Sequence, residues 1–113
     1  MRVLRVAALP DDALAASARF HLRDLAEAQA ALAAKEDLAL VFAPADHTHR
    51  GWRLAAVQGL AREHAPVRVN AIASDDEAGI AAALRYLQAA PGVTGQLLPL
   101  DSNGAGEVLS KAR

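Results

Sequence analysis

The run Leu38–Phe42 restricts the fold of this chain more than any other feature, because it contains only apolar residues. A strand with one face in water alternates apolar and polar residues, whereas a strand covered on both faces does not. Apolar residues at helical spacing predict a helix before this run, from 25 to about 34, and another after it, from 52 to about 64. Strands and helices that alternate in this way predict a parallel, three-layer α/β sheet.

The other elements follow from apolar runs and from the residues that end them. Further strands are expected at 3–8, 18–22, 67–72 and 95–100, which gives a Rossmann-like sheet of about five strands. A short helix is expected at 11–17. Asp24 and Ser74 each precede a glutamate by three residues, the pattern of a capping box at a helix start. Pro91 and Gly92 then end the last helix.

Length and charge limit the class of protein. The chain has 113 residues, which suits one minimal domain over 1–113 with a polar C-terminal tail at 104–113. The formal net charge of −1 and the scattered basic residues argue against a nucleic-acid partner or a membrane surface. The chain has no cysteine, and the N-terminal apolar run is too short for a secretory signal, so a cytoplasmic protein is expected.

Three phrases resemble one enzyme family. They are Arg-Val-Asn-Ala-Ile at 68–72, Val-Thr-Gly-Gln at 93–96, and the Ala55-Ala56 pair that begins a helix ending near 64. Together they resemble the C-terminal part of the short-chain dehydrogenases/reductases, which are Rossmann-fold NAD(P) oxidoreductases. The resemblance covers residues 18–101 and is strongest from Ala55 onward. It implies that Asp24 matches an aspartate that contacts the cofactor's adenine, and Asn70 is a second candidate for cofactor binding.

The chain departs from this family where its chemistry resides. The Gly-rich turn that holds the cofactor's pyrophosphate is absent, since the first glycine is Gly51. Phe42 and Ala43 stand where the family has an asparagine pair. The frame set by Ala55-Ala56 puts Arg50 in the position of the catalytic tyrosine and Leu54 in that of the lysine. Neither can replace a phenol acidified by a cation. We therefore expect no catalytic residue, no NAD(P) cofactor, and a degenerate, truncated relative of these enzymes.

Two histidines in one loop form the only candidate metal site. His47 and His49 have the spacing of a pair of zinc or nickel ligands. A polar connection is the simpler interpretation, because no third ligand is evident. Likewise, an N-cap role for Asp24 requires no cofactor.

Two classes of function remain open. The first is a non-catalytic domain that self-associates, as a homodimer or larger homo-oligomer, or accompanies a partner enzyme. The helix from 52 to 64 would then pack on its copy through Trp52, Ala56, Leu60 and Glu63. The second is a nucleotide or small-molecule binder, or a divergent enzyme, that uses the crevice at the carboxyl ends of the strands. The candidate groups for that crevice are His47, His49, Arg50 and Asn70.

Overall fold

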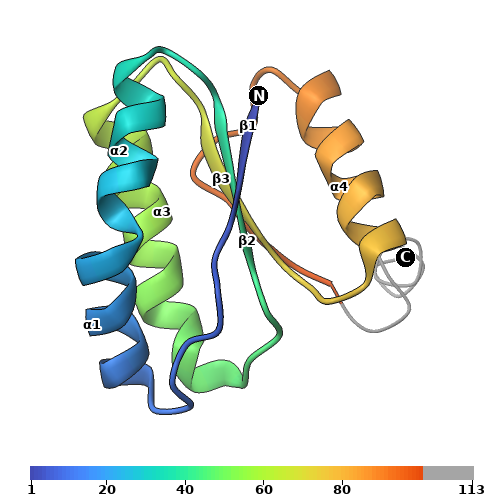
Figure 1. Cartoon of the computed structure of the whole chain (residues 1–113). Helices are drawn as coiled ribbons and strands as arrows, with labels where there is room; N and C mark the ends of the chain where they lie inside the picture. The colour runs from blue at the N-terminus through green and yellow to red at the C-terminus, as the bar shows by residue number, and fades with distance from the viewer. Residues whose placement is uncertain (101–113) are drawn as a thin grey trace.

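A parallel sheet of four strands forms the centre of the computed structural model, which describes residues 1–100 (Figure 1). The strands are β1 (Arg2–Arg5), β2 (Leu38–Phe42), β3 (Val69–Ala73) and β4 (Leu97–Pro99), and they lie in the sheet in this order. All three strand pairs are parallel. The expected parallel α/β sheet is confirmed, with one strand fewer than expected within these residues. The predicted polar tail at 104–113 lies outside the described residues.

Helices cover both faces of the sheet. One face carries α1 (Ala13–Arg23), α2 (Leu25–Ala33) and α3 (Arg50–Glu63), and the opposite face carries α4 (Glu77–Ala89), as Figure 1 shows. A short 3₁₀ helix, η1 (His47–His49), leads directly into α3. These three layers explain why all residues of β2 and of β3 are buried.

Alternate residues of each strand enter two separate cores. Leu40 and Ala71 belong to the core under α1, α2 and α3, whereas Val41 and Ile72 pack with Ile80 and other residues of α4. The strand order advances in one direction throughout, yet α3 and α4 lie on opposite faces. The β3–α4–β4 crossover therefore has the opposite hand to the β2–α3–β3 crossover, an uncommon combination because such crossovers are almost always right-handed.

The strand predicted at 18–22 is wrong, because these residues continue helix α1. Ala16 and Phe20 are buried one helical turn apart, and Leu22 is 87% exposed. The alternation that suggested a strand thus reflects a helix with a single buried stripe. The neighbouring bounds also differ: α1 extends past the end predicted at 17, and β1 stops at Arg5 instead of 8, although Val6 still donates to the Val41 carbonyl at 2.9 Å.

Both predicted capping boxes are wrong. Asp24 occupies the predicted N-cap position of α2, but it is in helical conformation and its side chain makes no cap; its carboxylate instead accepts from Arg23, with Nη2 at 3.0 Å. At α4 the N-cap is Asp76, which accepts from the Gly79 amide at 3.0 Å. Ser74 acts one step earlier, where its hydroxyl accepts from the Asp76 amide. No helix among residues 1–100 combines the length and the apolar character needed to cross a membrane.

Candidate functional site

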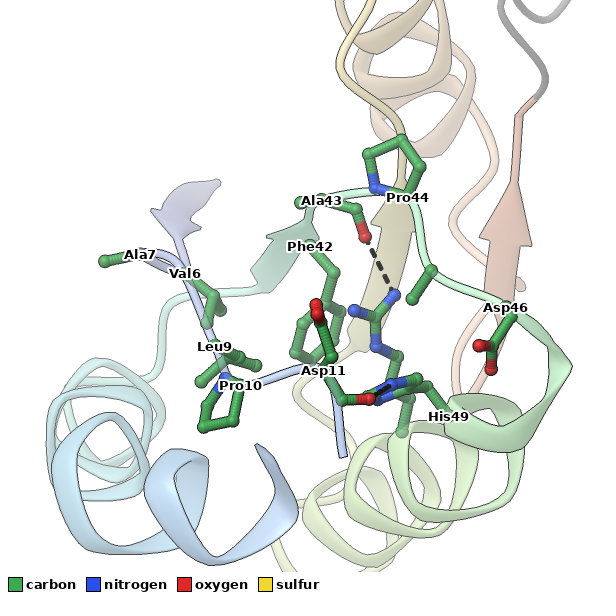
Figure 2. Close-up of a pocket in the computed structure, with 12 residues that line it drawn as sticks. Val6, Ala7, Leu9, Pro10, Asp11, Phe42, Ala43, Pro44, Asp46 and His49 are labelled. Atoms are coloured by element: carbon green, nitrogen blue, oxygen red, sulfur yellow. Dashed lines mark hydrogen bonds between the residues drawn. The ribbon is translucent and has the colours of Figure 1, made fainter. Parts of the chain in front are cut away.

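A cavity of about 300 Å³ lies at the carboxyl ends of β1 and β2, where both strands pass into loops (Figure 2). It is bordered by the loop after β1, the loop after β2, η1 and the start of α3. The apolar part of its wall includes Val6, Leu9, Pro10, Phe42 and Pro44, and the polar side chains are those of Asp11, Asp46, His49 and Arg53.

The loop after β2 is shaped by Asp46. Its carboxylate accepts from the Thr48 amide at 2.9 Å and from the Thr48 hydroxyl, and so caps η1. These bonds lower the pKa of Asp46 below its ordinary value, the hydroxyl bond contributing most. A carboxylate held in its ionised form thus stands at the border of the cavity. Asp11 contributes a second carboxylate from the loop before α1 (Figure 2).

Arg53 is the most unusual group in the site, because a charged side chain is only 6% exposed. Its Nη1 donates to the Ala43 carbonyl at 3.0 Å, the bond dashed in Figure 2, and its guanidinium carbon lies 4.5 Å from the centre of the Phe42 ring. Burial lowers the pKa of Arg53. Arginine nevertheless remains protonated in proteins, so the site contains a buried positive charge.

His49 is 4% exposed and uses both ring nitrogens within the protein. Nε2 lies 2.8 Å from the Asp11 carbonyl, and Nδ1 accepts from the Trp52 indole at 3.2 Å. This arrangement requires a neutral ring with its hydrogen on Nε2. His49 therefore ties the loop before α1 to α3, with no nitrogen left for a metal or a ligand.

The other predicted crevice groups lie elsewhere. His47 and Arg50 are exposed and do not line the cavity, and Leu54 is half-buried on α3. Without His49, His47 has no paired ligand, and residues 1–100 contain no cluster of three potential metal-ligating side chains. The prediction that grouped His47, His49 and Arg50 is thus corrected: of the three, only His49 lines the cavity.

Sequence reasoning missed Arg53, although a signal was present. Arg53, Val57 and Leu60 are the buried residues of α3, at spacing i, i+4, i+7. An arginine in the apolar stripe of a helix indicates either a buried ion pair or a binding group. Arg53 is easily overlooked in the sequence because it lies between the apolar residues Trp52 and Leu54.

Asp24 and Asn70 both lie outside the cavity. Asp24 sits at the α1–α2 junction rather than at a strand end, which removes the setting for an adenine contact. Asn70 is the second residue of β3, beside Ala39 near the amino end of β2, so its placement near the carboxyl ends is wrong. Its side-chain amide donates to the Val93 carbonyl at 3.0 Å and accepts from the Gln96 amide at 3.1 Å. Asn70 thus fastens the loop before β4.

The four residues predicted to meet a second subunit differ in their exposure. Leu60 is 4% exposed, and Trp52 packs on Phe20 and Phe42 at 5.6 Å between ring centres, so both belong to the core of their own chain. Ala56 is half-buried, whereas Glu63 is exposed. Phe20 of α1 packs on Trp52, so this part of the apolar side of α3 is buried within its own chain. Self-association itself stays a prediction.

Comparisons with known proteins show the family to which the chain belongs. A family model described as "Short chain dehydrogenase-like protein" matches residues 4–100. A search of curated proteins and a search of solved structures each gave no significant match. The matched span includes each helix that the structure describes and all of β2, β3 and β4.

Proposed function

We propose that this chain, which belongs to the SDR-like family of short chain dehydrogenase-like proteins, binds a small molecule in the cavity described above and catalyses no hydride transfer. The cavity is the observation that carries the proposal. Ligands of parallel α/β sheets bind outside the carboxyl ends of the strands, which is where it lies. Its wall combines apolar side chains with four polar ones, and a lining that contains both kinds is usual for small-molecule sites.

The non-redox part of the proposal rests on the start of α3. By the family resemblance, Arg50 stands where a tyrosine would exchange a proton with the substrate, and Leu54 where a lysine would acidify it. Arg50 is exposed and does not line the cavity, and a leucine carries no charge. The side chains that do reach the cavity offer a fixed cation, two carboxylates and a neutral histidine with both nitrogens engaged, and none of them is a phenol acidified by a cation.

The test is a panel of small metabolites together with NADH and NADPH. The emission of Trp52, the sole tryptophan, and the melting temperature report binding. Ala45→Phe fills the mouth of the cavity, while Ala81→Phe makes the same change on exposed α4 surface. We expect at least one compound to stabilise the wild type and Ala81→Phe but not Ala45→Phe, and no saturable effect of NADH or NADPH. A panel without any hit, or hits that survive Ala45→Phe, would contradict the proposal.

Self-association is a second candidate, supported by one exposed stripe of α1. Leu14 and Leu22 are 82% and 87% exposed, and Ala18 lies between them at spacing i, i+4, i+8. A helix stripe of this kind suits two-fold packing on a second copy, and a partner enzyme is the alternative occupant. Light scattering should show a dimer that Leu14→Ser with Leu22→Ser converts to monomer. A monomeric wild type at micromolar concentration would exclude the homodimer.

A further inference from the structure

One edge of the Arg53 guanidinium has no partner among the described residues. Nη1 is taken by the Ala43 carbonyl, whereas Nε is buried with no hydrogen bond and Nη2 makes none within residues 1–100. Nε and Nη2 form the side of the guanidinium that binds a carboxylate through two parallel hydrogen bonds. Arg53 therefore offers an unpaired Nη2 to the cavity that it lines, with the unpaired Nε buried beside it.

Arg53 has no ion-pair partner among residues 1–100. Asp11 and Asp46 line the same cavity, yet neither forms an ion pair with Arg53 among the described residues. Desolvation is also the sole cause of the lowered pKa of Arg53, which is consistent with no carboxylate close to it. A buried charge without a partner is costly to the folded state. An anion bound at this edge would offset that cost.

We propose that the ligand is a small monocarboxylate with an apolar group, an inference that rests on the proposed function. Its carboxylate accepts a hydrogen bond from Nη2 of Arg53, on the side of the guanidinium that faces away from the Ala43 carbonyl, and its apolar part lies against Phe42 and the Val6–Leu9 side of the cavity. One guanidinium balances one negative charge. A dianion such as phosphate also meets the carboxylates of Asp11 and Asp46 at the border, so like charges disfavour it.

The test compares anionic probes with neutral molecules of the same shape. Benzoate and butyrate are titrated beside benzamide and butyramide, with Trp52 emission and melting temperature as readouts; the Trp52 ring centre lies 5.8 Å from the Arg53 guanidinium carbon. We expect saturable millimolar binding of at least one carboxylate, with its amide and inorganic phosphate at least about tenfold weaker.

Variants locate the effect. Arg53→Met keeps a long apolar side chain on Phe42 without the charge and should weaken carboxylate binding by at least about tenfold. Arg53→Lys keeps the charge without the two-donor edge and should give an intermediate affinity. Arg50→Met is the matched control, because Arg50 lies one turn away, exposed and off the cavity, and its removal should change nothing.

The outcomes separate this inference from the proposed function. If amides bind as well as carboxylates, or Arg53→Met binds unchanged, the monocarboxylate assignment falls while a small-molecule cavity stands. If phosphate binds more tightly than either carboxylate, the ligand class is wrong. If neither carboxylate binds, the inference falls, and the metabolite panel alone decides the proposed function.

Discussion

Two arginines at opposite ends of the sheet are both largely buried, but only one has a partner at each guanidinium nitrogen. At the amino end of β3, Arg68 donates through Nε to Asp37 at 3.0 Å and through Nη1 to the Leu87 and Ala90 carbonyls at 2.8 Å, and its Nη2 lies 3.0 Å from the Asp37 carboxylate in an ion pair. At the carboxyl ends, Arg53 makes one hydrogen bond, to Ala43. A fully paired cation fixes structure, whereas a buried cation with a free edge beside a cavity indicates binding.

Asn70 adds to the paired end. Its amide holds the loop before β4 at both of its polar atoms, and Asp37 also accepts from the Arg68 backbone amide at 2.9 Å. The amino end thus joins the turn before β2, the C-terminus of α4 and the loop before β4 into one network. The carboxyl end remains open. This division agrees with the general rule that parallel sheets bind ligands at their carboxyl ends.

Arg68→Met should have the largest effect on stability. It removes the side-chain donors of the Asp37 carboxylate and of the Leu87 and Ala90 carbonyls, which keep only backbone donors, so we expect a loss of about 2–3 kcal/mol in unfolding free energy. That corresponds to a drop of roughly 10 °C or more in melting temperature. Urea unfolding and thermal melting measure it. A loss below about 1 kcal/mol would show that the network is not a structural lock.

Asp37→Asn should have an intermediate and pH-dependent effect. The backbone N–H of Arg68 and then its side chain lower the pKa of Asp37 below its ordinary value of 3.8. A group with a lowered folded-state pKa stabilises fully above its unfolded pKa, and the contribution is lost as the pH falls through the folded value. We expect the variant to be less stable by about 1 kcal/mol near pH 7.

The difference between wild type and Asp37→Asn should shrink as the pH falls below 3.8. Urea unfolding of both proteins at a series of pH values checks this, because the other titrating groups are common to both and cancel. A difference that stays constant down to the lowest pH at which both proteins fold would contradict the assignment of this pKa shift to folding.

Arg53→Met should have the smallest effect on stability, in contrast to Arg68→Met. The variant removes an uncompensated buried charge and keeps an apolar chain against Phe42, so the unfolding free energy should change by less than about 1 kcal/mol in either direction. The Ala43 carbonyl loses one donor but lies in an exposed loop residue where water can replace it. Urea unfolding measures this change. A loss of unfolding free energy as large as that of Arg68→Met would show that Arg53 is a structural residue.

Much of the fold could be predicted because its signals are local. The unbroken apolar run of β2 predicted a strand covered on both sides, and the i, i+3, i+4, i+7 pattern from Ile80 to Leu87 predicted the buried face of α4. The failures were also local. At 18–22 the alternation of side chains fits either a strand or a helix with one stripe, and only the packing of Phe20 on Phe42 and Trp52 selects the helix.

The candidate site was harder to predict because its parts are distant in the chain. His49 and Arg53 became interpretable only when the loop before α1, the end of β2 and α3 came together, and the His49–Asp11 bond spans 38 positions. His49 was a candidate group of the crevice and a weaker candidate metal ligand, whereas the fold engages both its nitrogens. Arg53 was read as one more surface arginine, whereas the fold buries it.

The sequence by itself determined that this chain forms a parallel α/β sheet of the short-chain dehydrogenase type. The signals are the unbroken apolar run of β2 and the short phrases that resemble the family, and both can be read from consecutive residues. Only the tertiary structure decided that α4 covers the opposite face from α3, that Arg68 is paired, and that Arg53 is not. Those outcomes depend on which distant groups meet, and no local pattern of residues specifies such meetings.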